Sequence, residues 1–377
     1  MATVLVEAKT DLRTIRVDGR TEAIMKGYGM IKVNEPGWIE AERPVAGPYD
    51  AICRPIALAP CSSDTHAMHG GSGPKENLIL GHEALGEVVE VGELVTKFKP
   101  GDRVVVPCNT PNWESPDLQR RGANNAHDIG LMKSFKFLGS KHGVFAEFFH
   151  VNNADANLVA MPDDISIDDA LMTVDMMSTG FYGVELADVQ FGDKVVVFGI
   201  GPVGLMAVAG AALRGASKII AIGTRPNCAA LAREYGATDI VSYKEGDIAE
   251  QILELCGPVE KTIIAGGNAQ SMNQALSIVK PNGTIASINF YDITEKFEIP
   301  VYQWGMGMSD VAIRCGFCPG GAYRIEKLLD MIRADRVHPG KLLNYRYEGF
   351  EKIEEAFKVM DEKPRDLIKP VVYVNWD

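Results

Sequence analysis

The sequence predicts an α/β protein in which a β-rich domain precedes a doubly wound parallel sheet, and three observations support this. Between residues 25 and 149, short apolar runs alternate with clusters of glycine, proline and aspartate, which is typical of strands and turns. Between residues 194 and 289, strand-like runs alternate with helix-like runs, which is typical of a parallel sheet covered by helices on both faces. The length of 377 residues is enough for two or three domains.

The first domain is expected to contain short strands and one long surface excursion. Apolar runs bounded by turn residues predict strands at residues 51–56, 85–91 and 103–107. Residues 113–141 are rich in asparagine, glycine, glutamine, arginine and histidine, and are expected to form a long surface loop. A helix is then expected near residues 167–186, because Asp168 and Asp169 stand where acidic side chains favour a helix N-terminus.

The second domain is expected to alternate strand and helix from residue 194 onward. Its strands are expected at residues 194–198, 218–222, 240–241, 262–265 and 283–289. Its helices are expected at residues 203–214, 227–235, 247–255 and 272–279. The chain is expected to end with helices at residues 323–333 and 350–360 and a closing strand at residues 369–374.

A glycine-rich segment follows the first strand of this second domain. Gly199-Ile200-Gly201-Pro202-Val203-Gly204 fits the pattern G-x-G-x-x-G, follows a β-branched strand and opens a helix. Small residues there let the backbone approach a pyrophosphate, whose negative charge the helix N–H groups face. The segment therefore predicts a dinucleotide-binding loop. The alternative is an ordinary turn from strand to helix.

The residues after the second strand of this domain indicate which dinucleotide binds. A site for NAD places Asp or Glu near the end of that strand, where it binds the ribose 2′-hydroxyl. Here Ile222 is followed by Gly223, Thr224 and Arg225, without an acid. A carboxylate would repel a 2′-phosphate, whereas a hydroxyl together with a guanidinium would bind one. The sequence therefore predicts NADP. The alternative is that Arg225 is a solvated surface charge.

Two short segments of the first domain hold residue types that bind zinc. Cys61 lies in one, and the adjacent pair His82 and Glu83 lies in the other. Thiolate, imidazole and carboxylate are all zinc ligands, and a catalytic zinc keeps one position open for substrate or water. From spacing alone, the alternative that these residues only pack in the core stays open, because buried free cysteines usually have no other role.

The combination of these features resembles one enzyme family. The β-rich domain, the motif Gly81-His82-Glu83 followed by Gly86, and the glycine loop are similar to those of the zinc-dependent medium-chain alcohol dehydrogenases. Longer segments resemble more closely the NADP-dependent secondary-alcohol dehydrogenases of anaerobic bacteria and protists. These segments are residues 38–40, 79–84, 99–104, 199–210, 236–240 and 366–372. The resemblance covers nearly everything from Met25 onward.

The resemblance implies a domain organisation and an assembly. A GroES-like β-rich catalytic domain is expected at residues 25–178 and 320–377, and a Rossmann domain that binds NADP at residues 179–319. Residues 1–24 are expected to be an accessory extension, because they mix arginines with acids and lack the apolar run of a secretory signal. The family is commonly tetrameric, so the resemblance also implies a homotetramer.

The resemblance further implies the roles of individual residues. It identifies Asp175, ahead of the run Met176-Met177-Ser178-Thr179-Gly180, as a metal ligand that spacing alone does not reveal. The implied zinc ligands are Cys61, His82, Glu83 and Asp175. Of these, Glu83 is expected to be loosened when substrate binds. Ser63 and His66 match the relay that carries the alcohol proton to solvent. The implied pocket for the adenosine 2′-phosphate consists of Gly223, Thr224, Arg225 and Tyr243, with Tyr243 beside the adenine.

Some positions depart from the pattern of this subfamily. Residues 109–137 differ considerably from it. Asn109 stands where an apolar pocket wall is expected, Phe135 stands where tryptophan is usual, and Phe317 is larger than the usual residue. These three residues are expected to reshape the substrate pocket. The identity of the alcohol is therefore open, whereas the type of reaction is not.

The composition argues against several classes of partner. With 38 basic and 50 acidic residues the net charge is −12, so nucleic acid is not an expected partner. No uninterrupted apolar run is long enough to span a membrane. Seven cysteines at irregular spacing do not form a disulfide framework, which favours a cytoplasmic location. Cys315 and Cys318 form a lone C-x-x-C pair, expected to be structural. The wider family often holds a structural zinc with four closely spaced cysteines, and no such cluster is present here, so the resemblance implies one zinc per subunit.

The predicted activity is reversible hydride transfer between NADP and a short secondary alcohol or ketone, with short aldehydes as further substrates. Zinc would act as a Lewis acid on the substrate oxygen, and Ser63 would pass its proton towards His66. Three alternatives stay open: a zinc polyol dehydrogenase, a metal-free NADPH quinone or enoyl reductase of the same fold, and a non-catalytic NADP-binding protein. The first usually prefers NAD, which would require an acid after Ile222.

Overall fold

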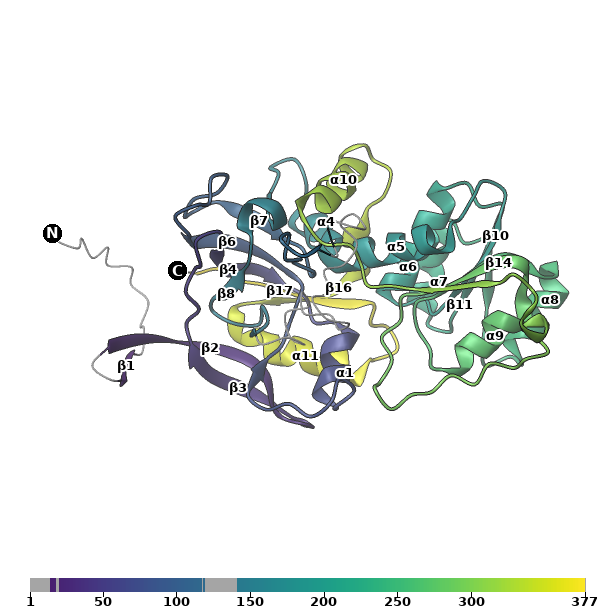
Figure 1. Cartoon of the computed structure of the whole chain (residues 1–377), viewed down its shortest axis with the longest axis horizontal. Coiled ribbons are helices and arrows are strands. Elements are labelled where there is room, and N and C mark those ends of the chain that lie inside the picture. The colour runs from purple at the N-terminus through teal and green to yellow at the C-terminus, as the bar shows by residue number, and fades with distance from the viewer. Residues whose placement is uncertain (1–13, 18–19, 117, 119–140, 377) are drawn as a thin grey trace.

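The computed structural model describes residues 14–17, 20–116, 118 and 141–376. In Figure 1 these residues form two lobes that lie side by side, one containing β2, β3, β4, β6 and β17 and the other containing β10, β11 and β14 with their helices. Most of the excursion expected at residues 113–141 lies outside the described residues, as does Phe135. Among the described residues, no helix is both long and apolar enough to cross a membrane.

The first lobe contains two sheets. The smaller one joins β1 (Thr14–Val17), β2 (Arg20–Lys32), β3 (Glu35–Glu42) and β5 (Leu78–Ile79). The larger one joins β16 (Leu343–Glu348), β17 (Lys369–Tyr373), β4 (Ala51–Leu58), β6 (Ala84–Val91), β7 (Arg103–Val106) and β9 (Val159–Ala160) in that order, with β8 (Phe149–Val151) paired to β4. The three strands predicted for this region correspond to β4, β6 and β7. Strand β2 runs across position 24, the expected end of the accessory extension.

The second lobe is built on a six-stranded sheet in which every neighbouring pair is parallel. Its strands, in spatial order, are β12 (Asp239–Val241), β11 (Lys218–Ile222), β10 (Lys194–Phe198), β13 (Val259–Ile264), β14 (Val279–Ser287) and β15 (Ala312–Cys315). The connecting helices are α6 (Pro202–Leu213), α7 (Pro226–Glu234), α8 (Ile248–Cys256) and α9 (Gln270–Ile278). The predicted doubly wound sheet is confirmed. The strand order reverses between β10 and β13, and such a reversal creates a crevice at the carboxyl ends of the strands.

The remaining helices lie around the junction of the two lobes and over the first lobe. They are α1 (Ser62–Met68), α3 (Ala154–Asn157), α10 (Ala322–Arg333) and α11 (Ile353–Glu362), with short 3₁₀ turns η2 (Gly305–Gly307), η3 (Pro339–Leu342) and η4 (Phe350–Lys352). The helices predicted near the C-terminus correspond to α10 and to η4 followed by α11, and the predicted closing strand corresponds to β17.

The helix expected near residues 167–186 is divided into three parts. It consists of α4 (Ile167–Met172), a π-helical turn η1 (Thr173–Met177) and α5 (Ser178–Ala187). All five residues of η1 are buried, and Asp175 is the middle one. Single π turns inside helices are often found at functional sites, and Asp175 lies in such a turn here.

Gly180 allows α5 to lie directly against α6. A Cβ atom at Gly180 would stand 2.6 Å from the carbonyl oxygen of Val203 and 2.7 Å from the backbone nitrogen of Ala207. Such separations are too short for any side chain, so only glycine permits this contact. Because α5 follows η1 and α6 follows the glycine loop, the contact sets the distance between Asp175 and that loop.

Replacing Gly180 by alanine is expected to lower the free energy of unfolding by about 1–3 kcal/mol, because backbone atoms of α6 must move to admit the methyl group. This loss outweighs the gain of roughly 1 kcal/mol that alanine brings to a helix. Gly210→Ala on α6 is the matched comparison. There the new Cβ would meet the side chains of Phe181 and Val184 at 3.1 Å, and side chains yield more easily. Urea denaturation at equal protein concentration measures both, and a Gly180→Ala variant as stable as the unchanged protein would contradict the argument.

Candidate active site and metal centre

Cys61 is held at the start of a short helix. It is the N-cap of α1, and its backbone N–H donates to Asp64 Oδ2 at 2.9 Å, while the N–H of Asp64 donates to the carbonyl oxygen of Cys61 at 3.1 Å. The arrangement fixes Cys61 at the start of α1 and turns the Asp64 carboxylate inwards, towards the segment that contains His82.

His82 lies fully buried between β5 and β6, where Asp64 orients its ring. Asp64 Oδ1 accepts from the Gly81 N–H at 3.1 Å and lies 3.1 Å from His82 Nδ1. Gly81 has φ +93°, and a Cβ there would stand 2.2 Å from the ring of Phe145, so this position requires glycine. With Nδ1 engaged by Asp64, the other ring nitrogen, Nε2, is directed to Asp175 Oδ2 at 3.2 Å. Such a carboxylate partner is typical of histidines that bind metals.

Asp175 projects from the π turn η1 into the same cluster. Its Oδ1 accepts a hydrogen bond of 2.5 Å from the Thr179 hydroxyl, and its Oδ2 lies 3.9 Å from Cys61 Sγ. Burial acts to raise the pKa of Asp175, but the interaction with His82 outweighs it and lowers the pKa below its usual value. Asp175 is therefore a carboxylate that is buried and charged.

Glu83 is fully buried and has an unusual partner. Its Oε1 accepts from Lys369 Nζ at 2.7 Å, and the same ammonium group donates to the carbonyl oxygen of Pro60 at 3.1 Å. Burial raises the pKa of Glu83 to about 7, although Lys369 opposes the shift. The other carboxylate oxygen, Oε2, is buried and has no hydrogen-bond partner, which is costly unless some further group binds there.

The four predicted ligands fit a zinc ion by geometry and by charge. Cys61, His82, Glu83 and Asp175 each offer one ligand atom within 4.8 Å of the others. The 3.2 Å between His82 Nε2 and Asp175 Oδ2 is close to the roughly 3.3 Å expected for two tetrahedral ligands with bonds of about 2.0 Å. Burial lowers the pKa of His82, but Asp64 and Asp175 raise it well above the usual value, so the surroundings favour a positive charge here. The unpaired Glu83 Oε2 is one more free ligand atom.

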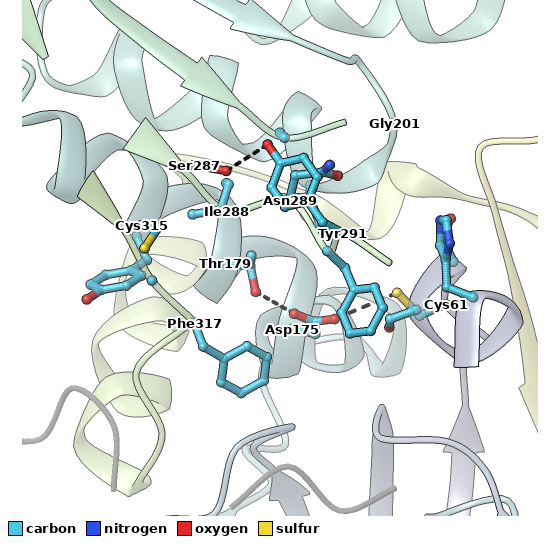
Figure 2. A pocket seen from close by; sticks show the side chains of 18 of the residues that line it. Cys61, Asp175, Thr179, Gly201, Ser287, Ile288, Asn289, Tyr291, Cys315 and Phe317 are labelled. Carbon is cyan, nitrogen blue, oxygen red and sulfur yellow. Dashed lines mark hydrogen bonds between the residues drawn. The ribbon is translucent and has the colours of Figure 1, made fainter. Parts of the chain in front are cut away.

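A single cavity of about 800 Å³ connects this cluster to the glycine loop. Cys61, Ser63, His66 and Asp175 line it on one side, and residues 201–203 line it on the other. Figure 2 shows Cys61, Asp175 and Thr179 grouped together, with Gly201 further along the cavity. A cofactor bound at the loop and a substrate bound at the cluster would therefore share one cavity, as hydride transfer requires.

The predicted relay residues lie at the edge of the metal cluster. Ser63 Oγ is 3.4 Å from His82 Nε2, and both Ser63 and His66 line the cavity. The side chain of His66 is 43% exposed, and its Nδ1 lies 3.3 Å from Asp292 Oδ1, which belongs to the other lobe. The pair therefore extends from the buried cluster to a solvent-exposed ring.

The glycine loop has the conformation that the sequence predicts. Gly199 has φ +83°, and a Cβ at Gly204 would stand 1.8 Å from the Gly199 carbonyl oxygen. Gly201 caps the N-terminus of α6, which Pro202 opens. Both glycines are required by this geometry, and the N-terminus of α6 that follows the loop is where an anion would bind.

The residues predicted to select the cofactor gather beside this loop. Thr224 Oγ1 donates to the Tyr243 hydroxyl at 2.9 Å, and a Cβ at Gly201 would stand 3.6 Å from Arg225 Nη2. Arg225 Nη1 also donates to the Leu367 carbonyl oxygen at 2.5 Å, which holds the guanidinium between the lobes. The side chain of Ile200 fills the space over Gly223, where a Cβ would stand 2.2 Å from it.

Asn109, Phe135 and Phe317 were expected to line the substrate pocket. Phe317 lines the cavity, and Phe135 lies outside the described residues. Asn109 is not among the described residues that line the cavity, contrary to the expectation. It is fully buried, and its amide donates to the Cys318 carbonyl oxygen at 3.0 Å because the chain after β7 packs on residues 318–320.

Three residues that support the metal cluster are missing from the sequence-based prediction. Asp64, Thr179 and Lys369 hold His82, Asp175 and Glu83, respectively. Each leaves a weak signal in the sequence. Asp64 stands at the capping-box spacing from Cys61, Thr179 stands one helical turn after Asp175, and Lys369 interrupts an otherwise apolar strand.

Comparisons with known proteins agree with this geometry. Residues 47–163 match the family model of the alcohol dehydrogenase GroES-like domain, and residues 202–334 match that of the zinc-binding dehydrogenases. The NADP-dependent isopropanol dehydrogenase of Thermoanaerobacter brockii is 53% identical over 351 residues, which cover 92% of this chain and 99% of the relative. The enzyme of the same name from Entamoeba histolytica is 47% identical over 96% of this chain and 98% of its own length.

A solved structure agrees with the fold as well. The zinc-dependent alcohol dehydrogenase 2 from Streptococcus pneumonia superposes with a TM-score of 0.83 and 25% identity, covering 94% of this chain and 99% of that one. The identities over nearly the full length confirm the predicted family and its GroES-like and Rossmann folds. This chain belongs to the zinc-dependent medium-chain alcohol dehydrogenases.

Proposed function

We propose that this enzyme transfers hydride reversibly between NADP and a short secondary alcohol or its ketone, with short aldehydes as further substrates. The observation that carries the proposal is the single cavity that joins the four-residue metal cluster to the glycine loop. The names of the relatives support the substrate class, since they are isopropanol dehydrogenases. A polyol dehydrogenase that prefers NAD fits less well, because no acid follows Ile222.

Cys61, His82, Asp175 and Glu83 would hold the zinc ion. When bound, zinc supplies Lewis-acid chemistry that polarises the substrate oxygen and lowers the pKa of the alcohol. Glu83 is the ligand proposed to loosen when substrate binds, and its salt bridge to Lys369 supports this role, because that ammonium group offers the carboxylate a second partner. Asp64 and Thr179 keep His82 and Asp175 in place.

Ser63 and His66 are proposed to move the alcohol proton out of the cavity. Ser63 stands beside the cluster and would accept the proton from the substrate hydroxyl, passing it along towards His66. His66 reaches solvent, so the proton would leave from its ring. The apolar lining between the lobes, which includes Met176, Ile288 and Phe290, would exclude bulk water from the reacting carbon.

The adenosine 2′-phosphate of NADP is proposed to bind Gly223, Thr224, Arg225 and Tyr243. The proximity of Arg225 to Gly201 and the hydrogen bond between Thr224 and Tyr243 support this pocket.

We also propose that the chain divides into one domain at residues 25–178 and 320–377 and a second domain at residues 179–319. The first boundary falls at the first residue of α5, directly after η1, and the second falls just before α10. Residues 1–24 are proposed to be an accessory extension.

A homotetramer is proposed because the second lobe exposes apolar side chains around an edge strand. The exposed residues are Ile293, Phe297, Ile299, Val301, Tyr302, Met306, Met308 and Ile313. Ile313 lies on β15, an edge strand of the parallel sheet, and the other seven lie in the chain segment that precedes this strand. Apolar patches and unpaired strand edges are typical of surfaces that self-associate.

A cytoplasmic location is proposed because all seven cysteines are free thiols, as expected in a reducing compartment.

Purified enzyme is expected to contain about one zinc per chain by elemental analysis, and chelation is expected to abolish activity. Asp175→Ala is expected to lose both the zinc and at least about 10³-fold of the activity, because several kcal/mol of charge stabilisation depend on the metal. Asp64→Asn is the matched comparison, because it keeps all four ligands and is expected to weaken zinc binding only about 10–100-fold. Two zinc ions per chain, or full activity without zinc, would contradict the proposed centre.

Ser63→Ala is expected to lower kcat by about 10²–10⁴-fold, because a positioned proton-transfer group contributes that much to a rate. Its zinc content is expected to be unchanged, since Ser63 is not a proposed ligand. Ser62→Ala, one residue earlier on α1 and also facing the cavity, serves as the control. Steady-state kinetics together with zinc analysis distinguish the roles, and full activity in Ser63→Ala would remove the relay from the mechanism.

Arg225→Gln is expected to raise KM for NADPH by roughly 10–100-fold, because a hydrogen bond to a charged group contributes about 1.5–3 kcal/mol. KM for NADH is expected to change little, since that cofactor has no 2′-phosphate. Arg233→Gln, at the exposed end of the following helix α7, removes the same charge away from the loop and is the control. Equal losses for both cofactors in Arg225→Gln would show that Arg225 has only a structural role.

A further inference from the structure

Two cysteines from distant parts of the chain meet behind the cavity wall. Cys108 Sγ and Cys318 Sγ lie 3.2 Å apart, and both residues are fully buried. Both are free thiols. A disulfide bond measures about 2.05 Å, so the two sulfur atoms need to approach by only about 1.2 Å. The cysteine in contact with Cys318 is therefore Cys108, which lies outside the C-x-x-C motif.

Hydrogen bonds on both sides hold this pair in place. The backbone N–H of Cys108 donates to the Val174 carbonyl oxygen at 3.1 Å. The Asn109 amide donates to the Cys318 carbonyl oxygen at 3.0 Å. Cys315, by contrast, is exposed at the cavity on strand β15. The fold thus aligns Cys108 with Cys318 through hydrogen bonds that do not involve the sulfur atoms.

We propose that Cys108 and Cys318 are an oxidation site, where a reversible disulfide forms and lowers the activity of the enzyme. The oxidant is a peroxide. One sulfur, as thiolate, attacks a peroxide oxygen; the O–O bond breaks, a sulfenic acid forms, and the departing hydroxide takes up a proton to become water. The second sulfur then attacks the sulfenic sulfur, the S–O bond breaks, and the hydroxyl leaves with the second thiol's proton as water. Two thiols and one peroxide thus give one disulfide and two waters.

The loss of activity follows from what the two cysteines contact. An Asp175 carboxylate oxygen lies within 4.8 Å of both sulfur atoms, and Cys108 is bonded to Val174, the neighbour of Asp175. Phe317, the neighbour of Cys318, lines the cavity. When the two sulfur atoms move about 1 Å closer together, they therefore shift both Asp175, a proposed zinc ligand, and the cavity wall at Phe317. Displacements of that size at positioning residues can lower rates by as much as 10²-fold.

The route of the oxidant and the rate of the reaction also follow from the structure. Gly316 and Phe317, which precede Cys318 in the chain, line the cavity, so we expect the peroxide to enter from that side. Burial raises the pKa of the Cys108 thiol well above its usual value. Because both sulfur atoms are buried whereas Cys315 is exposed, the reaction is expected to be slower at this pair than at Cys315.

The test treats the purified full-length enzyme with hydrogen peroxide, blocks the remaining thiols and maps the cross-linked peptides by mass spectrometry. We expect a peptide pair joining Cys108 to Cys318, a fall of roughly tenfold or more in kcat/KM, and recovery of both with dithiothreitol. Each variant is compared with its own reduced form. Cys108→Ala is expected to keep its activity in peroxide, whereas Cys315→Ala is expected to remain sensitive. Cys318→Ala replaces the first variant if that one fails to fold.

Three results would overturn the inference. They are a Cys315–Cys318 cross-link in place of the expected one, no Cys108–Cys318 cross-link after prolonged treatment, and a cross-link that leaves kcat/KM unchanged. The effect on activity depends on the proposed function, whereas the cross-link does not. Reduced enzyme that is inactive with NADP and secondary alcohols would therefore refute the proposed function and leave the peptide map to decide whether the disulfide forms.

Discussion

The contact between α5 and α6 at Gly180 is the constraint on which the site depends. It brings the helix that follows Asp175 against the helix that follows the glycine loop, with no side chain between their backbones. The metal cluster belongs to the first lobe and the loop to the second, so their separation would otherwise depend on a hinge. Close-packed helices do not deform continuously. The contact between α5 and α6 therefore fixes the distance between the metal cluster and the glycine loop across the cavity.

Charge balance is the second requirement, because the site buries more acids than bases. Asp64, Glu83 and Asp175 are buried carboxylates, and Cys61 adds a thiolate when it binds metal. Lys369 is the buried lysine that opposes them, through Glu83. Uncompensated buried charge is strongly unfavourable. A divalent cation bound by Cys61, His82 and Asp175 would supply the missing positive charge. The residues proposed to serve catalysis therefore stabilise the fold only when their negative charges are neutralised.

The segment around residues 316–320 has three roles that compete with one another. Phe317 lines the cavity, Cys318 contacts Cys108, and a Cβ at Gly320 would stand 2.1 Å from the Asn109 carbonyl oxygen. A residue exchanged for the sake of substrate size therefore also affects the thiol pair. Asn109, expected at the pocket, instead donates to the Cys318 carbonyl oxygen and belongs to the same set of contacts.

The sequence by itself determined the features that depend on neighbours along the chain. Alternating strands and helices predicted the parallel sheet, the pattern of glycines predicted the dinucleotide loop, and the absence of an acid after Ile222 predicted NADP. Edge strands β15 and β16 were not predicted, because three of the four residues of β15 and three of the six residues of β16 are exposed, which leaves no long apolar run. The π turn η1 was not predicted either, because its residues continue the helical pattern on both sides.

Only the tertiary structure decided which chemical groups meet. His82 and Asp175 are 93 positions apart, Glu83 and Lys369 are 286 apart, and Cys108 and Cys318 are 210 apart. The resemblance to a known family supplied the four proposed ligands but not the residues that orient them. Periodicity and spacing describe contacts within one element, whereas these pairs form where separate elements pack together. The side chains that tune the site were therefore visible only once the sheets and helices were in place.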